Sequence, residues 1–189
     1  MYRNNGNFRG NCITQKELQL SNSLRKLWVE HVMWTRSFII STASDLKDLD
    51  AVTKRLLRNP TDLAKLFMPF YGSQTAKKIE QLFTEHLSIA GQLVNAAKEG
   101  KPDAVTELRN KWYANADEIA SFLNEINPFW DKKTWQTMLY DHLRMTENEA
   151  VQILTQQYEA SINEYDSIQE QALNMADFMT RGIINQFNL

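Results

Sequence analysis

Three histidines are the residues of this 189-residue chain best suited to chemistry. His31, His86 and His142 are separated by 55 and 56 positions, and each follows an acidic residue and precedes an aliphatic one. Neutral imidazole is a common ligand of transition metals, and helical bundles hold metal ions between facing helices. We therefore predict that the three side chains meet in a core and bind a zinc, iron or manganese ion or a small ligand, and otherwise no cofactor.

Each histidine interrupts an apolar stripe that has helical spacing. Steps of three and four residues place side chains on one face of a helix, which packs against partner helices. The stripes are Leu20, Leu24, Leu27, His31, Trp34 and Phe38; Ile79, Leu82, His86, Ile89, Leu93 and Ala96; and Trp135, Met138, His142 and Met145. The spacing predicts that the histidines face the core, and the regular separation suggests duplication of a helix pair.

A fourth metal ligand is predicted at Glu149, seven residues after His142. The acids that directly precede the histidines point about 100° away around the helix, which makes them poorer ligands. The last helix offers three alternatives, Glu159, Asp166 and Asp177.

A competing interpretation makes the histidines neutral core residues with no ligand. Buried ring nitrogens usually bond a hydroxyl, carbonyl or amide group. The sequence offers Thr35, Thr146, Asn115 and Tyr165 as such partners. Iron redox chemistry is disfavoured under either interpretation, because Trp28, Phe83 and Leu139 stand where a di-iron Glu-x-x-His motif has glutamate. The single cysteine, Cys12, is interpreted as an incidental thiol.

The histidine stripes belong to helices whose ends carry recognisable signals. Thr14 and Glu17 have the spacing of a capping box, so a helix is predicted to begin there. The next boundaries are Asn59-Pro60, Gly72-Ser73, Gly100 before Pro102, and Asn127-Pro128. A shorter helix is predicted from about residue 132, and a second capping box, Thr146 with Glu149, predicts a kink or restart before a long last helix.

These elements predict an all-α fold, an antiparallel four-helix, ferritin-like bundle with additional short helices. Six glycines and four prolines are too few turn residues for many short strands. We expect residues 1–13 to form a disordered polar arm and residues 14–189 a single domain. A net charge of −2 without a basic cluster argues against nucleic acid, and no apolar run reaches the roughly 20 residues of a membrane span. We expect a cytoplasmic protein with no membrane partner, compatible with a homodimer.

Six segments in order resemble one family of small helical proteins from Firmicutes, which is poorly characterised and is often labelled acetylglutamate kinase. They are HVMWTR, RLLRNPTDLAKLFMPFYG, WYANADEIASFL, INPFW, LYDHLRMT and MADFMTRGIINQF, and they cover roughly residues 24–187. The resemblance implies a ferritin-like or similar up-and-down bundle and no established activity. The chain has no Gly-rich phosphate loop that would support the kinase label.

The leading hypothesis is a non-enzymatic or weakly catalytic bundle that binds a metal ion or small ligand through His31, His86 and His142. The alternative is a structural or interaction protein, associated with spores, in which the histidines only satisfy the core and nothing is catalysed. A kinase ranks third, because nothing in the sequence supplies its phosphate-binding elements.

Overall fold

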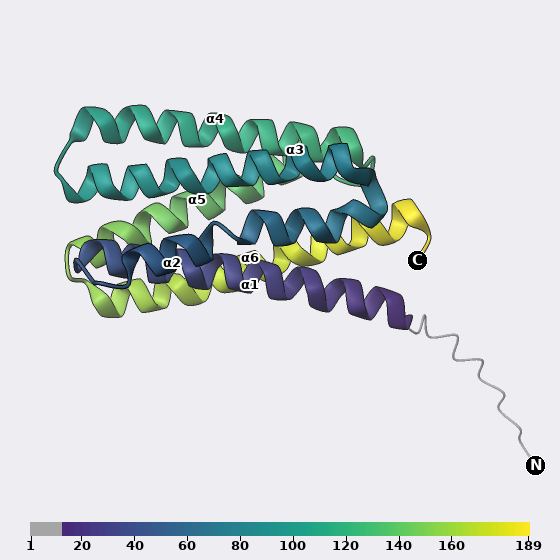
Figure 1. Ribbon diagram of the computed structural model, residues 1–189, viewed down its shortest axis with the longest axis horizontal. Coiled ribbons are helices and arrows are strands. Elements are labelled where there is room, and N and C mark those ends of the chain that lie inside the picture. Colours follow the sequence, from purple (N-terminus) through teal and green to yellow (C-terminus); the bar gives the residue numbers. More distant parts are fainter. Residues whose placement is uncertain (1–12) are drawn as a thin grey trace, which may run out of the picture.

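The computed structural model describes residues 13–189, which form five long helices and one short helix (Figure 1). They are α1 (Gln15–Ala43), α2 (Leu49–Leu56), α3 (Asn59–Lys98), α4 (Pro102–Ile126), α5 (Lys132–Leu154) and α6 (Tyr158–Phe187). The predicted all-α class is confirmed, but the long helices number five instead of four. Cys12 and all but the last residue of the predicted polar arm lie outside the described residues.

Several helix ends lie where local chemistry predicts them. The capping box is formed: the Thr14 hydroxyl accepts from the Glu17 backbone N–H at 3.1 Å, and the Thr14 N–H donates to the Glu17 carboxylate at 2.6 Å. Gly100 has a φ of 67°, the left-handed conformation that ends helices, and Pro102 opens α4. α3 consists of two arms, residues 59–71 and 73–98, because Gly72 has non-helical angles between them.

The predicted restart at Thr146 and Glu149 is wrong, because α5 continues through both residues. The Thr146 hydroxyl donates to the His142 carbonyl at 2.9 Å inside the helix, and the Glu149 carboxylate binds Arg36 of α1 instead of the local backbone. The chain turns later, at residues 155–157, where Gln156 has a φ of 61°.

The helices form three hairpins: α1 with the first arm of α3, the second arm of α3 with α4, and α5 with α6. In Figure 1 the first helices of the three hairpins run in one direction and their partners run in the other. α2 lies in the connection of the first hairpin. The bundle is therefore antiparallel within each hairpin and built from three similar units.

Equivalent positions of the hairpins have equivalent environments. Seven residues before each histidine stand Leu24, Ile79 and Trp135, whose side chains are all fully buried. On the second helices, three sets of buried residues follow the same spacing: Leu63, Ala64 and Phe67; Ile119, Ala120 and Leu123; Met175, Ala176 and Met179. The predicted repeat of about 55 residues is thus a threefold repeat of structure, one more unit than a duplication would give.

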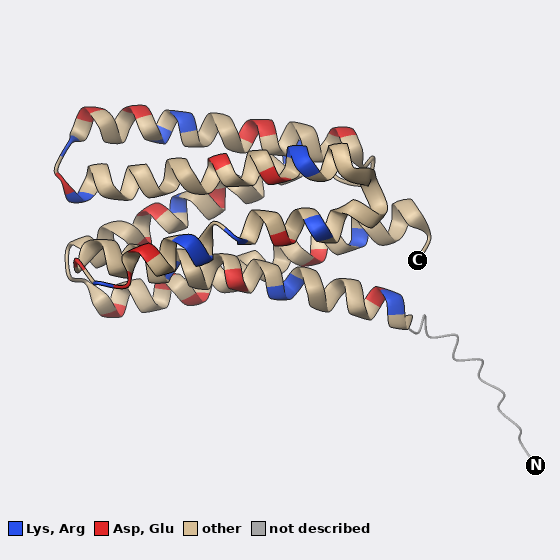
Figure 2. Ribbon diagram, viewed as in Figure 1, with Lys and Arg blue, Asp and Glu red and all other residues tan. Residues whose placement is uncertain are grey.

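The core runs along the axis of this bundle, and charged residues other than Glu149 lie outside it or at its edge. Figure 2 shows Lys and Arg interspersed with Asp and Glu along the helices, without a segment of one sign. None of the helices in residues 13–189 combines the length and apolar character that crossing a membrane requires.

Candidate functional site

The structure buries all three histidines in the core and places the rings of His31 and His142 beside each other. His31, His86 and His142 lie on the first helices of the three hairpins, and their exposed fractions are only 6%, 4% and 4%. The ring centroids of His31 and His142 are 5.5 Å apart, with the rings tilted by 35°. Trp28 contacts both rings edge-on, at centroid distances of 5.7 Å and 6.4 Å. We call these three imidazoles the histidine layer.

A carboxamide from the second helix of the hairpin orients the His86 ring. The Asn115 side chain donates through Nδ2 to the Leu82 carbonyl at 3.2 Å, which leaves its oxygen as the acceptor facing the histidine. His86 Nδ1 lies 2.8 Å from that oxygen. Nδ1 therefore carries the proton of the neutral ring, and Nε2 keeps its lone pair. Asn115 is one of the partners that the sequence predicts.

The third hairpin repeats this arrangement. Gln171 donates to the Met138 carbonyl at 2.8 Å, and its oxygen lies 3.1 Å from His142 Nδ1. Gln171 follows His142 by 29 residues, the same separation as between His86 and Asn115. The Nδ1–H tautomer is assigned here too.

The first hairpin has the same hydrogen bond from a carboxamide to a backbone carbonyl. Asn59 donates to the Leu27 carbonyl at 2.9 Å, and Leu27 precedes His31 by four residues, as Leu82 and Met138 precede their histidines. Two other predicted partners are not bonded to imidazole: Thr35 and Thr146 donate to the backbone carbonyls of His31 and His142.

Burial makes the histidine layer neutral. It is the main cause that lowers the pKa of His86 and of His142 to about 4, although the carboxamide bonds oppose it. The pKa of His31 is also well below its ordinary value, first because of burial and then because of the nearby charges that His142 and His86 would carry. At neutral pH the layer therefore presents imidazoles whose lone pairs are not blocked by protons.

Glu149 does not join the histidine layer. Its carboxylate is 1% exposed and pairs with the Arg36 guanidinium at 2.5 Å. Burial raises the pKa of Glu149 to about 6, against the opposing effect of Arg36. Of the alternative acids, Glu159 and Asp166 are exposed and Asp177 pairs with Arg25 at 2.6 Å. Across residues 13–189, no three His, Cys, Asp or Glu side chains are arranged to hold a metal ion.

A cavity of about 190 Å³ lies one helical turn beyond the histidine layer. Thr35, Ala90 and Thr146 each follow a histidine by four residues, and all three line it. The remaining walls are almost entirely apolar, and small residues leave the space: Gly91, Ala97 and Ala150. We call this space the core cavity. Sequence reasoning missed it because the gaps come from small side chains on different helices that no single stripe reveals.

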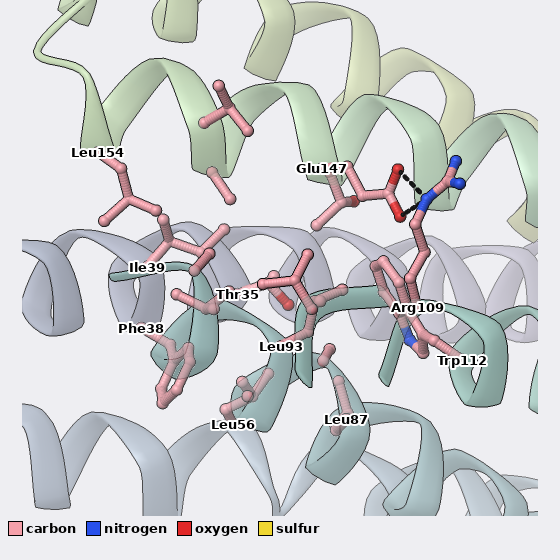
Figure 3. A pocket seen from close by; sticks show the side chains of 18 residues that line it. Thr35, Phe38, Ile39, Leu56, Leu87, Leu93, Arg109, Trp112, Glu147 and Leu154 are labelled. Atoms are coloured by element: carbon pink, nitrogen blue, oxygen red, sulfur yellow. Dashed lines mark hydrogen bonds and ion pairs between the residues drawn. The ribbon is translucent and has the colours of Figure 1, made fainter. Parts of the chain in front are cut away.

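An ion pair and an indole lie together on one side of the core cavity, opposite Phe38 and Leu154 (Figure 3). Arg109 Nε donates to both carboxylate oxygens of Glu147, at 2.8 Å and 3.1 Å. Trp112 follows one turn along α4, and its ring centroid is 5.3 Å from that of His86. The Trp112 ring therefore lines the core cavity and also contacts His86 of the histidine layer.

A second cavity, of about 280 Å³, adjoins the core cavity beneath α2. Four residues line both spaces: Phe38, Leu56, Leu87 and Gly91. The outer cavity is more polar, with Asp50 and Gln92 in its lining. Phe38 thus stands between an apolar space and a more polar one that borders the short helix.

Comparison with protein-family models, with curated proteins and with solved structures found no match to this chain. The interpretation of the site consequently depends on its own geometry.

Proposed function

We propose that this protein binds a small apolar molecule in the core cavity, next to the histidine layer. The observation that carries the proposal is the cavity itself, an apolar space of about 190 Å³ whose walls come from all three hairpins. An apolar cavity of about 150 Å³ is large enough to bind benzene in another protein. The space here suits a molecule with a ring or a short chain.

The chemistry of the walls favours binding over catalysis. The lining contains no histidine and no cysteine, and its one carboxylate, Glu147, is bound by Arg109. The neighbouring imidazoles have a pKa far below neutrality, so they are poorly matched to proton transfer at pH 7. Shape and apolar contact are then the means by which the cavity selects its ligand.

Binding is tested with benzene and n-hexane, followed by the melting temperature as a function of ligand concentration. A molecule that binds only the folded state raises the melting temperature as its concentration rises. We expect this rise for the native chain and its loss in Ala90→Leu, which fills the core cavity. Ala104→Leu is the matched control, since Ala104 is also partly buried on a helix but lies outside the lining. No rise in the native chain, or an equal rise in Ala90→Leu, would contradict the proposal.

A second candidate function is binding of one transition-metal ion by the histidine layer. The 5.5 Å separation of the His31 and His142 centroids favours it, since two imidazoles on one zinc ion, bonded at about 2.0–2.1 Å, have centroids about 5 Å apart. Hydrogen bonds at Nδ1 also orient metal-ligating histidines in other proteins. A third ligand is not in place among residues 13–189, and Glu149 would have to leave Arg36 to serve as one.

Elemental analysis of tag-free protein separates the two candidates, before and after supplementation with zinc, iron and manganese. Metal binding predicts close to one equivalent of metal per protein, which His142→Leu should lose. Less than about a tenth of an equivalent of zinc, iron or manganese would rule this candidate out. A ferritin-like carboxylate di-iron centre gains no support from a core layer of imidazoles and carboxamides. Absence of both metal and apolar-ligand binding would favour the structural or interaction protein.

A further inference from the structure

We infer that the ligand of the core cavity is a long-chain amphiphile, whose unbranched alkyl chain begins in the core cavity, passes Phe38 and carries a polar end group in the outer cavity. This inference rests on the proposed function and adds the length and the polarity of the ligand. Phe38 is then a specificity-determining residue, because the position of its ring decides whether the chain can use one cavity or both.

Neither cavity alone has the volume of an ordinary ligand site. Pockets for small molecules usually occupy about 300–1,000 Å³. The core cavity has about 190 Å³ and the outer cavity about 280 Å³. Because the outer cavity is the larger one, joining the two more than doubles the space of the core cavity and brings it into that range. A ligand confined to the core cavity would use less than half of the joined space.

The two cavities meet at four residues that line both of them: Phe38, Leu56, Leu87 and Gly91. Phe38, Leu56 and Leu87 lie along one side of the core cavity, away from Glu147 (Figure 3). Gly91 has no side chain, and a Cβ atom built on it would lie 3.3 Å from Phe38 Cζ. The Phe38 ring therefore fills the gap beside Gly91 and has cavity space on both sides. Rotation of this one side chain would join the two cavities.

The outer cavity lies between α2 and the second arm of α3, whereas α2 is fixed to α1. Arg55 pairs with Glu30 at 2.9 Å and lies over the Trp34 ring, 5.1 Å from its centroid. Just before α2, the Asp48 carboxylate accepts a hydrogen bond from Ser41 at 2.9 Å. Among residues 13–189, the side chains of α2 form hydrogen bonds and ion pairs only with α1 or within α2 itself. The gap between α2 and α3 can therefore widen for an alkyl chain without loss of a polar contact.

The two cavities differ in polarity, which gives the chain a direction. The core cavity has almost entirely apolar walls, and the outer cavity is more polar. Polar residues of α2 and α3 line the outer cavity: Asp50, Thr53, Ser88, Gln92 and Asn95. Asp50, Gln92 and Asn95 are exposed, so a polar end group beside them stays in contact with water. The same group would lose its hydration in the core cavity, which therefore receives the alkyl end.

The test compares hexan-1-ol, decan-1-ol and decane-1,10-diol, whose dissociation constants are measured by calorimetry. Each methylene group removed from water adds to affinity, so the four additional groups of decan-1-ol should tighten binding to the native chain about 100-fold over hexan-1-ol. The diol has the same length but must place its second hydroxyl group among apolar walls. It should bind at least about tenfold more weakly than decan-1-ol.

Ser88→Leu fills the outer cavity and spares the core cavity, because Ser88 lines only the outer one. This variant should reduce the advantage of decan-1-ol over hexan-1-ol to less than about threefold, since the additional methylene groups then stay in water. It should keep its affinity for hexan-1-ol, which also shows that it is folded. Thr84→Leu is the matched control: Thr84 lies one turn earlier on α3, is also partly buried and lines neither cavity. It should keep the full advantage.

Equal affinities of hexan-1-ol and decan-1-ol for the native chain, or an undiminished advantage of decan-1-ol in Ser88→Leu, would overturn the inference. A diol that binds as tightly as decan-1-ol would overturn it too. The proposed function would stand in each case, because hexan-1-ol would still bind. If neither alcohol binds, the proposed function itself fails. Should Ser88→Leu not fold, the order of the three affinities in the native chain decides.

Discussion

The carboxamides of Asn115 and Gln171 determine what the core histidines can do. Each side chain uses its N–H₂ group on a backbone carbonyl and offers its oxygen to a histidine Nδ1. This arrangement satisfies one ring nitrogen and fixes the tautomer, while burial outweighs the opposing effect of the carboxamide bonds and keeps the rings neutral. The sequence alone indicates Asn115, because it stands in the apolar stripe of its helix. Gln171 lies beside such a stripe and Asn59 resembles a helix-breaking position, so their roles emerge only from packing.

Protonation of the buried histidines should make the free energy of unfolding depend on pH. The folded pKa of His86 and His142 is about 4, below the ordinary value of 6.5. The unfolded chain therefore binds more protons between these two values, and the free energy of unfolding falls as pH drops from 6.5 towards 4. Each histidine contributes up to about 1.4 kcal/mol per pH unit in this range. Urea unfolding at several pH values measures the slope.

His142→Leu provides the comparison. Because it removes one histidine that takes up a proton on unfolding, it should lower the slope of the free energy of unfolding against pH by up to about 1.4 kcal/mol per pH unit. Glu149 has the opposite sign: its raised pKa, about 6, makes the folded state bind the extra proton between 6 and its ordinary 4.5. The difference between the native chain and the variant is therefore the quantity to compare, because Glu149 contributes equally to both. Identical slopes would show that His142 is not buried in the neutral form.

The bond between His86 and Asn115 can be tested separately. Asn115→Leu leaves the buried His86 Nδ1–H without its acceptor, and we expect a loss of about 1–3 kcal/mol in the free energy of unfolding. In His86→Leu/Asn115→Leu both polar groups are gone, so the double variant should lose less than the sum of the two single variants. A double-mutant cycle from urea unfolding gives the coupling. Additive losses would mean that the two side chains do not interact.

At the scale of elements, helix ends that depend on adjacent residues are predictable and those that depend on distant residues are not. The Thr14–Glu17 box and the Gly100 turn involve only neighbouring residues, and both form as the sequence indicates. The Thr146–Glu149 spacing is the same as the first box, but Arg36 from α1 binds Glu149 and the helix continues. The true break at Gln156 has no glycine to mark it.

Close packing between α6 and the residues after α4 depends on one glycine. A Cβ atom at Gly182 would lie 1.9 Å from Trp130 Nε1, and Trp130 is fully buried with its N–H donated to the Met179 carbonyl. Gly182→Ala should therefore displace the indole and lower the free energy of unfolding by about 3 kcal/mol or more. Urea unfolding measures the loss.

Gly91→Ala is the matched control on α3. Its Cβ atom would lie 3.3 Å from Phe38 Cζ, and the ring has cavity space on both sides into which it can move. Alanine also favours a helix over glycine by about 1 kcal/mol, so the stability of this variant should change little or increase. Comparable losses in both glycine variants would mean that the indole contact is not what distinguishes Gly182.

At the scale of the molecule, the histidine spacing of 55 and 56 residues predicts repetition, and the structure shows three hairpins that repeat it. The spacing alone does not determine whether the rings share one depth in the bundle. It does not predict the core cavity, because that space depends on Ala90, Gly91 and Ala150 leaving room at the same height on different hairpins. The cavity volume depends on how the helices pack together, whereas an apolar stripe in the sequence describes one helix only.

Closure of the three hairpins on one another should make unfolding cooperative. In a linear array of repeats each unit contacts only its neighbours, and parts can unfold separately. Here the first and last hairpins also meet: Arg25 of α1 pairs with Asp177 of α6 at 2.6 Å, and Arg36 of α1 pairs with Glu149 of α5. The rings of His31 and His142, from the first and last hairpins, also contact each other, so loss of either hairpin would expose the other ring to water.

We therefore expect a single urea transition, with the same midpoint for helix content by circular dichroism and for tryptophan fluorescence. The tryptophans sample all three units, because Trp28, Trp112 and Trp135 lie on α1, α4 and α5. A hairpin that unfolded early would expose its own indole and shift the fluorescence before most of the helix signal is lost. Two separated midpoints would show that the hairpins are independent, and a cavity bounded by all three would then not survive partial unfolding.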